Sequence, residues 1–251
     1  MTLAQPLASL PPPDPWTADG SALFLDLDGT LAAIEARPQD VMPQPWRSHL
    51  LARLEKRLGG RLAVISGRTL EDVDRILDGS VRAVAAVHGL FVRRPDGVVE
   101  SAQAGSGMDA ARTRFQALAD AHPSLLLEDK GVSLALHYRQ APLLGAVVCA
   151  AAEELAAQAE LRLQRGQMVA EVCTPGFDKA SAVRSFMRMP PFAGAAPVFV
   201  GDDLTDEAGF TAAQAMDGCG VLVGPGRETA ARRRLADVEA VRNWLEQGLD
   251  G

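Results

Sequence analysis

The sequence predicts an α/β fold, a doubly wound parallel sheet with a smaller α+β unit inserted between its two halves. Three observations carry this prediction. Short apolar runs alternate with helical periodicity in the first 90 residues and recur after residue 195. Most of these runs end in polar residues and glycine, as buried parallel strands end at functional loops. Small-residue and Pro/Gly stretches bound a middle segment whose strands and helices follow a different order.

The first half of the sheet is predicted from three apolar runs. They lie at residues 22–29, 61–65 and 83–87. They end, in the same order, in Asp26-Leu27-Asp28-Gly29, Ser66-Gly67-Arg68 and His88-Gly89. Helical periodicity over 45–58 separates the first two runs, and Thr69 with Asp72 resembles a capping box that opens a helix to Leu77. Strands and helices therefore alternate.

The second half supplies two more buried runs, at residues 198–200 and 221–223, which makes five parallel strands. The first of them is followed at once by Gly201-Asp202-Asp203. Ligands of open parallel sheets bind outside the carboxyl ends of the strands. We therefore expect four polar side chains to converge at one edge: Asp26, Ser66, His88 and Asp202.

The domain organisation predicted from these boundaries has three parts. Residues 1–20 form a proline-rich arm, expected to be extended or poorly ordered because proline blocks helix and sheet hydrogen bonds. The core comprises 21–105 and 175–251, and the insert comprises 106–174. Periodicity in the insert predicts the order αββαββ, with elements near 108–121, 125–129, 132–138, 143–159, 161–164 and 168–173.

Composition excludes several classes of protein. Of the 251 residues, 47% are hydrophobic and 23% are charged, which is typical of a globular chain and not of a disordered or fibrous one. The net charge of −7 repels polyanions and anionic membranes, so no nucleic-acid or membrane partner is expected. The three cysteines lack CxxC spacing and support no disulfide framework or zinc site. Without a signal peptide or a spanning segment, the expected location is the cytoplasm, as a monomer or weak oligomer.

Two acidic clusters point to chemistry. Asp26 and Asp28, two residues apart at a strand end, can divide the work of a nucleophile and a proton carrier. Gly29 lets the backbone approach an anion, so the spacing suits phosphoryl transfer. The segment GDDLTDE at 201–207 offers the hard oxygen ligands that Mg²⁺ prefers.

Each feature also has a purely structural interpretation. Asp-x-Asp-Gly is a common Asx turn, and an acidic run or Ser66-Gly67-Arg68 can cap a helix. His88-Gly89 can be a turn, and Lys179 can be a solvated helix lysine. Their order along one chain favours the functional interpretation.

Four motifs in this order resemble the haloacid dehalogenase-like phosphatases. The motifs are DLDGTL at 26–31, SGR at 66–68, the lysine at 179 and GDDLTDE at 201–207. Three further stretches are similar to the trehalose-6-phosphate phosphatase family: VHG at 87–89, EDKGVSLALHYR at 128–139, and MVAEVCTP through Lys179. This resemblance spans about residues 22–245. It implies Mg²⁺-dependent hydrolysis of trehalose 6-phosphate, a small-molecule sugar phosphate, to trehalose and phosphate.

The resemblance also implies a role for each matched residue. Asp26 is the expected nucleophile, which forms an aspartyl-phosphate, and Asp28 is the expected general acid and base. Ser66 and Lys179 are expected to hold the phosphoryl oxygens. The expected Mg²⁺ ligands are Asp26, the backbone carbonyl of Asp28, Asp202 and, directly or through water, Asp206, with Asp203 orienting them. Further core residues expected to contact the substrate are Gly29, Arg68, His88 and Gly89.

The insert is expected to bind the sugar. Strand alternation places Glu128 with Lys130, and His137 with Arg139, on common faces, a pattern that by itself favours a surface ion pair over a sugar site. The resemblance assigns these four residues and Glu171 to the distal glucose.

Two alternative functions remain open at this point. One is a sugar phosphatase acting on sucrose phosphate or a mannosyl phosphate, against which the five insert residues argue. The other is a catalytically silent sugar-phosphate sensor, against which the retention of both Asp26 and Asp28 argues. Two positions depart from the family pattern: Gln167, where relatives often carry lysine, bears on a substrate contact, and Ala180, where glycine is usual, bears on helix packing.

Overall fold

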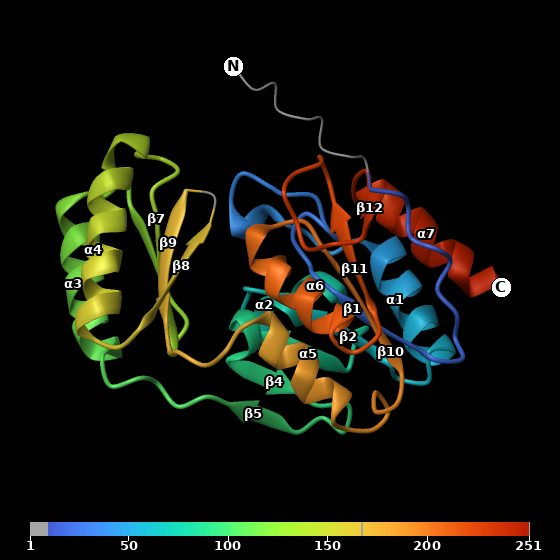
Figure 1. The fold of residues 1–251 in the computed structure, drawn as a ribbon. Coiled ribbons are helices and arrows are strands. Elements are labelled where there is room, and N and C mark those ends of the chain that lie inside the picture. Colours follow the sequence, from blue (N-terminus) through green and yellow to red (C-terminus); the bar gives the residue numbers. More distant parts are fainter. Residues whose placement is uncertain (1–9, 167, 251) are drawn as a thin grey trace, which may run out of the picture. The chain divides into compact units, whose positions relative to one another are not determined.

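The computed structural model describes residues 10–166 and 168–250 and separates into two compact units (Figure 1). The core unit is Met1–Glu100 with Asp178–Gly251, and the inserted unit is Ser101–Phe177. The insert expected from the sequence, 106–174, begins and ends a few residues inside this unit. Each unit has its own sheet and its own hydrophobic core.

Strand β1 (Ser21–Leu25) lies within the core sheet, between β10 (Ala196–Gly201) and β2 (Leu62–Ile65), and runs parallel to both. The full order is β12-β11-β10-β1-β2-β3-β4-β5. The other strands are β3 (Ala83–Ala86), β4 (Phe91–Arg93), β5 (Val99–Ser101), β11 (Cys219–Val223) and β12 (Arg233–Leu235). The chain moves outward from β1 through β2 and β3, and in the opposite direction from β10 through β11 and β12. The doubly wound prediction is therefore confirmed.

The predicted number of five strands is wrong, because three strands at the sheet edges escape detection. Strand β4 runs antiparallel to β3, β5 continues beyond it, and β12 extends the opposite edge. Each of the three has only three residues. Edge strands are not covered on all sides, so they lack the continuous apolar run that marks a buried parallel strand.

Helices cover both faces of the core sheet (Figure 1). They are α1 (Pro45–Arg57), α2 (Leu70–Leu77), α5 (Lys179–Met187), α6 (Glu207–Gln214) and α7 (Val238–Asp250). Helix α1 packs against α7, and α5 packs against α6. The predicted start of α2 is confirmed, since the Thr69 hydroxyl accepts a hydrogen bond from the backbone N–H of Asp72.

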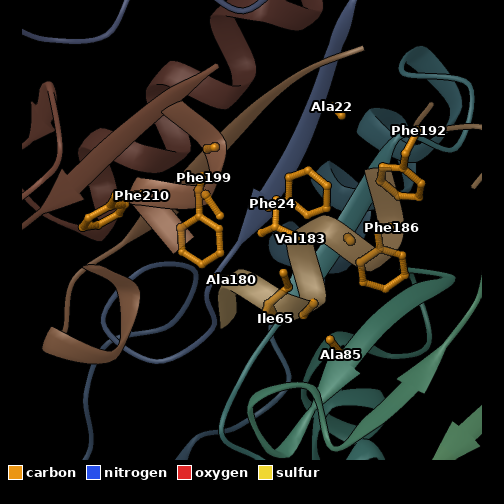
Figure 2. Packing of buried hydrophobic residues seen from close by; sticks show 14 of the residues in the cluster. Ala22, Phe24, Ile65, Ala85, Ala180, Val183, Phe186, Phe192, Phe199 and Phe210 are labelled. Atoms are coloured by element: carbon orange, nitrogen blue, oxygen red, sulfur yellow. The ribbon is translucent and has the colours of Figure 1, made fainter. Parts of the chain in front are cut away.

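Five phenylalanine rings fill the core between the sheet and helices α5 and α6 (Figure 2). Phe24 of β1 stacks on Phe192 with ring centroids 5.5 Å apart, and Phe186 of α5 lies 5.3 Å from Phe192. Phe199 of β10 meets Phe210 of α6 edge to face at 5.8 Å. Burying each ring contributes roughly 1.5–3 kcal/mol. This packing holds rigidly the strands and helices whose ends carry the polar residues.

The described part of the proline-rich arm, residues 10–20, contains no helix and no strand, as expected for an extended segment. It is nevertheless anchored to the core. Trp16 is 5% exposed, and its indole N–H donates to the carbonyl of Leu245 at 3.3 Å. The indole N–H of Trp244 donates to the carbonyl of Asp14 at 2.9 Å. The alternative of a poorly ordered arm therefore does not hold for residues 10–20.

The inserted unit contains a four-stranded antiparallel sheet in the order β6-β7-β9-β8. Its elements are α3 (Met108–Ala121), β6 (Leu126–Asp129), β7 (Ser133–His137), α4 (Gly145–Gln158), β8 (Arg162–Gly166) and β9 (Val169–Cys173), which is the αββαββ order that the periodicity predicts. Leu134 and Leu136 of β7 pack into the core formed with α3 and α4. By alternation, Ser133, Ala135 and His137 belong to the opposite face.

Neither disulfide bonds nor bilayer-spanning helices occur within residues 10–166 and 168–250. Cys149, Cys173 and Cys219 are all free thiols. No helix in these ranges combines the length and the apolar composition that crossing a membrane requires.

Candidate active site

The carboxyl ends of β1 and β10 bring three carboxylates and one ammonium group together. Asp26 follows β1, Asp202 follows β10, and Asp206 ends the short 3-10 helix Leu204–Asp206 that precedes α6. Lys179 Nζ lies 2.9 Å from Oδ1 of Asp26 and 2.6 Å from Oδ1 of Asp206. Lys179 is only 2% exposed, so its interpretation as a solvated helix lysine is wrong.

The charges in this cluster do not balance. Burial raises the pKa of Asp26 well above its usual range, and Lys179 opposes the shift. Burial and the neighbouring Asp206 carboxylate raise the pKa of Asp202 to about 7. Burial alone would lower the pKa of Lys179, but Asp206 and Asp26 outweigh it and raise that pKa. One ammonium group faces three acids, so the cluster favours binding of a further cation.

Asp202 carries the least satisfied carboxylate of the three. Its Oδ1 is buried and accepts no hydrogen bond from any residue that the structure describes. Gly29 lies directly against this carboxylate, at a φ of 77°. A Cβ at position 29 would come within 2.1 Å of Oδ2 of Asp202. Glycine is therefore required here both for its backbone conformation and to leave space for Asp202.

These residues fit a hard divalent cation. One carboxylate oxygen from each of Asp26, Asp202 and Asp206 lies within 4.8 Å of the others. A buried carboxylate oxygen without a donor, beside two further carboxylates, is a donor set that suits Mg²⁺. Both oxygens of Asp206 are already engaged, because Lys179 and the backbone N–H of Asp203 donate to them at 2.6 and 2.9 Å. Asp26 and Asp202 are therefore the better placed for direct ligation.

Asp28, on the loop after β1, forms a two-pronged ion pair with Arg68. The Nε–Oδ2 and Nη2–Oδ1 distances are 2.6 and 2.7 Å. Arg68 also donates to the carbonyl of Pro38 at 2.8 Å, and its backbone N–H donates to Ser66 Oγ at 3.2 Å. The Asp28 side chain is 36% exposed. The structure thus brings Asp28, Ser66 and Arg68 together, and the Asp28 carboxylate is ion-paired with Arg68.

Two consecutive left-handed residues bend the chain after β3. Val87 and His88 have φ values of 47° and 55°. Their backbone N–H groups donate to the carbonyls of Arg68 and Ser66, both at 2.9 Å. A left-handed conformation is strained for a β-branched valine, and these hydrogen bonds offset the strain. The turn places the His88 ring against Gly67, where a Cβ would lie 2.5 Å from Nε2.

Gly89, at the end of this turn, packs against the start of α5, the helix that carries Lys179. It has a φ of 98°, and a Cβ there would lie 3.2 Å from the carbonyl of Asp178. Asp178 caps α5, since its Oδ1 accepts from the backbone N–H of Ser181 at 2.7 Å and its own N–H donates to Ser181 Oγ at 2.9 Å. Ala180 is 5% exposed and packs in the core beside the sheet. The departure from glycine at position 180 is therefore a matter of packing.

The inserted unit carries a polar cluster on the sheet face opposite α3 and α4. Glu171 of β9 accepts a hydrogen bond from Ser133 Oγ at 2.7 Å and lies 3.3 Å from Lys130 Nζ. Glu128 Oε2 lies 3.0 Å from His137 Nε2 and 3.7 Å from Lys130 Nζ. Burial would raise the pKa of Glu128, but the hydrogen bond with His137 and the charge of Lys130 lower it. Four of the five residues expected in the insert therefore lie together.

The fifth residue, Arg139, differs from expectation. Strand β7 ends at His137, and Arg139 lies in the turn beyond it, exposed. The alternation that would put both side chains on one face requires a regular strand through residue 139, and β7 ends before it, so the shared face stays a prediction. Gln167, the other departure from the family pattern, lies outside the residues that the structure describes.

Three residues near these sites were not predicted. Ser133 lies on the same face of β7 as His137, so strand alternation could have identified it as a member of the polar cluster. Arg47 of α1 is 2% exposed, with Nε and Nη1 unpartnered among the described residues. Burial lowers the pKa of Arg47 and the charge of Asp28 opposes the shift. The sequence could have identified Arg47, because it is a charged residue at a position on the apolar face of α1. Arg227 lies in a loop, where no periodicity marks it.

Comparison with known proteins agrees with this architecture. A family model described as trehalose-phosphatase matches residues 24–239. A probable trehalose-phosphate phosphatase of Sinorhizobium fredii is 35% identical over 213 residues, covering 82% of this chain and 79% of the relative. The trehalose-6-phosphate phosphatase of Escherichia coli is 36% identical over 227 residues, covering 90% of this chain and 85% of the relative.

Two solved structures share the fold. The crystal structure of a trehalose-6-phosphate phosphatase related protein superposes with a TM-score of 0.73 at 26% identity, covering 91% of this chain and 96% of that one. A haloacid dehalogenase-like hydrolase from Bacteroides thetaiotaomicron superposes with a TM-score of 0.65 at 15% identity, covering 90% and 98%.

The doubly wound core, with acidic residues at the ends of β1 and β10, belongs to the same fold class as that haloacid dehalogenase-like hydrolase. Within that class the matches extend through both units of this chain. The chain belongs to the trehalose-phosphatase family. It is accordingly a phosphoric monoester hydrolase.

Proposed function

We propose that the protein hydrolyses trehalose 6-phosphate to trehalose and phosphate, with Mg²⁺ as cofactor and Asp26 as nucleophile. The observation that carries this proposal is the buried cluster in which Lys179 lies 2.9 Å from Asp26 while Asp202 has an unsatisfied oxygen. The cluster combines a nucleophilic carboxylate, a cation for phosphoryl oxygens and donors for a metal ion. The substrate is supported by the names of the relatives in Sinorhizobium fredii and Escherichia coli.

In the first half-reaction a carboxylate oxygen of Asp26 attacks phosphorus, and the bond from phosphorus to the sugar oxygen breaks. The phosphoryl group is then carried by Asp26 as an acyl phosphate. Asp28 gives a proton to the departing sugar oxygen, so trehalose leaves neutral. Asp28 must be free of Arg68 to do this. The substrate dianion competes for the guanidinium, and Arg68 and Ser66 then bind phosphoryl oxygens together with Lys179.

In the second half-reaction Asp28 takes a proton from water, and the water oxygen attacks the phosphorus of the acyl phosphate. The bond from phosphorus to Asp26 breaks and inorganic phosphate is released. Asp26 is again a free carboxylate and Asp28 is again protonated. One residue therefore serves both half-reactions.

The cation site would be formed by the carboxylates of Asp26 and Asp202. These carboxylates and the backbone carbonyl of Asp28 would hold Mg²⁺, and Asp206, with both oxygens engaged, would act through water. When bound, Mg²⁺ reduces the repulsion between the Asp26 carboxylate and the phosphate dianion. Gly29 leaves space for the Asp202 carboxylate, and Gly89 leaves space for the backbone carbonyl of Asp178. The backbone of His88 is hydrogen-bonded to Ser66 and would help to position it.

The polar cluster of the inserted unit would provide sugar recognition. Glu171 and Ser133 are buried and hydrogen-bonded to each other, and Lys130 and Glu128 lie beside them. Such groups can exchange partners with sugar hydroxyls, and a site built from them rejects sugars that lack the matching hydroxyl. Arg139 would contribute from the turn after β7.

The test is phosphate release with Mg²⁺ across four substrates: trehalose 6-phosphate, glucose 6-phosphate, sucrose 6-phosphate and a small aryl phosphate. We expect trehalose 6-phosphate to have the highest kcat/KM. Purified Asp26→Asn, measured in parallel, excludes a contaminating phosphatase. A preference for sucrose 6-phosphate would identify a different sugar phosphatase, and binding of trehalose 6-phosphate without turnover would identify a sensor.

A further inference from the structure

The loop between β11 and β12 is tied to the acidic segment by one arginine. Arg227 Nη2 donates to the backbone carbonyl of Asp203 at 2.8 Å and to that of Asp202 at 3.3 Å. Its Nη1 donates to the carbonyl of Glu228 at 3.1 Å and pairs with the carboxylate of Glu207. A single side chain thus bonds both residues that follow β10 and the first residue of α6.

Glu207 in turn fixes this arginine to its own loop. Glu207 Oε1 also accepts from the Thr229 hydroxyl at 2.8 Å, and Oε2 accepts from the backbone N–H of Ala230 at 2.6 Å. The side chains of Arg227 and Glu207 are 25% and 26% exposed, so the pair is partly shielded from water. Because a guanidinium is planar and presents its donors in a fixed fork, it can hold three carbonyls and a carboxylate at once.

The orientation of Asp202 depends on its backbone. The buried Oδ1 of its carboxylate accepts no hydrogen bond in residues 10–166 and 168–250, and Gly29 offers no side chain to contact it. The carbonyl of the same residue is held by Arg227. The adjoining Asp203 carbonyl is held as well, and the Asp203 N–H donates to Asp206 at 2.9 Å. Both acids after β10 are therefore linked to the arginine through the backbone.

We infer that Arg227 is a positioning residue for the cation site, an inference that rests on the proposed Mg²⁺-dependent function. It fixes the backbone at positions 202 and 203, and so directs the Asp202 carboxylate at the cation. Glu207 holds Arg227 in the geometry that does this. Partners of this kind, which orient a ligand without touching the metal, typically change metal affinity 10- to 100-fold when they are removed.

The test is Mg²⁺ binding by isothermal titration calorimetry, without substrate, for wild type, Arg227→Met and Arg227→Lys. We expect Arg227→Met to weaken binding by about 10-fold or more. Arg227→Lys should recover part of the affinity, because an ammonium group can replace some but not all of the fork. At saturating Mg²⁺, Arg227→Met should regain most of its kcat, since the arginine acts through the cation.

A matched control is Arg75→Met. Arg75 has a comparable environment, with Asp72 Oδ1 at 3.1 Å and the carbonyl of Val41 at 3.2 Å, but it does not touch the acidic segment. Its substitution should leave Mg²⁺ affinity unchanged. Melting temperatures in EDTA show whether each variant is folded.

The outcomes separate this inference from the proposed function. Wild type that binds no Mg²⁺ would overturn both. Wild type that binds Mg²⁺, with Arg227→Met binding equally tightly, would overturn the role of Arg227 alone. If Arg227→Met does not fold, Glu207→Gln takes its place. Weakened Mg²⁺ affinity in Glu207→Gln would support the positioning role of Arg227, and wild-type affinity would overturn it.

Discussion

The ammonium nitrogen of Lys179 lies 2.6 Å from Oδ1 of Asp206, a carboxylate with no exposed surface. The same nitrogen lies 2.9 Å from Asp26. Lys179 is thus the shared counter-charge of Asp26, the proposed nucleophile, and of Asp206, an acid beside the proposed cation site. Its two roles, in stability and in substrate binding, can be measured separately.

Lys179→Met should lower the free energy of unfolding by about 3–5 kcal/mol, because it leaves two buried carboxylates without their partner. Urea denaturation in EDTA at pH 8 measures this loss. Arg242→Met is the control: it breaks the pair with Glu246, whose side chains are 34% and 40% exposed. That change should cost no more than about 1 kcal/mol. Equal losses in the two variants would contradict the importance assigned to burial.

Asp26→Asn should abolish turnover while leaving the fold intact. The amide keeps the shape of the carboxylate but cannot attack phosphorus. We expect activity below about 1% of wild type, measured as phosphate release, with an unchanged circular dichroism spectrum. Residual activity well above that level in a purified sample would show that another group is the nucleophile.

Removing the metal should stop the reaction, and Asp202 should be needed to restore it. EDTA is expected to abolish hydrolysis by wild type, and added Mg²⁺ to recover it. Asp202→Asn should fail to recover at the same Mg²⁺ concentration. In EDTA at pH 8, however, this variant should be at least as stable as wild type, because it removes a carboxylate whose pKa burial raises to about 7. Wild-type Mg²⁺ dependence in the variant would remove Asp202 from the ligand set.

Substitution of Glu171 should separate sugar recognition from chemistry. Glu171→Ala should reduce kcat/KM for trehalose 6-phosphate by about 10- to 150-fold, the equivalent of about 1.5–3 kcal/mol for one charged hydrogen bond. Hydrolysis of a small aryl phosphate should barely change, because this substrate has no sugar for the insert to bind. Arg114→Ala, on the exposed side of α3, controls for loss of charge on the insert. Equal losses on both substrates would assign Glu171 to the stability of the insert.

Glu55 should make stability fall as the pH rises. Burial raises its pKa from 4.5 to about 7, with Arg82 opposing, and its Oε2 accepts no hydrogen bond in the described part of the chain. Between pH 4.5 and 7 the unfolded state loses this proton while the folded state keeps it, so unfolding becomes easier, and above pH 7 the penalty is complete.

Glu55→Gln removes that dependence. It should stabilise the protein by about 1 kcal/mol at pH 8, a value reduced for the partial exposure of the side chain, and by less at pH 5. Urea denaturation of wild type and variant at both pH values measures the difference. Exposed Glu228→Gln should show no such change with pH. A gain that is equal at pH 5 and pH 8 would mean that the titration of Glu55 is not its cause.

Much of the fold of the core unit could be predicted from sequence patterns that reflect burial. The five predicted strands are continuous apolar runs because helices cover both faces of the sheet. Parallel strands also present their carboxyl ends at one edge, which is why residues as distant in sequence as Asp26 and Asp202 meet. Lys179 is found beside them because a capped helix begins at the same edge. These features depend on periodicity and order, which a sequence displays directly.

Contacts made by loops and strand ends could not be predicted in the same way. Three hydrogen bonds of Arg227 go to backbone carbonyls, which every residue possesses and which no motif records. Alternation cannot place Arg139, because it gives no information on where a strand stops, and β7 stops at His137. The helical position of Arg47 indicates that it is buried, but it does not show that Nε and Nη1 lack hydrogen-bond partners among the described residues.

The central position of β1 has a consequence for synthesis of the chain. Its neighbour β10 pairs Ser21 with Ala196, so β1 leaves the ribosome with one edge unpaired until the entire insert has been translated. Closing so long a loop costs chain entropy before any contact is gained, whereas the insert is built from contacts close in sequence. Strand β10 and the 3-10 turn after it also bring Asp202 and Asp206, and α5 brings Lys179 just before them. A nascent chain therefore carries Asp26, the proposed nucleophile, from the start but gains the other residues of the acidic cluster only after the insert has been translated.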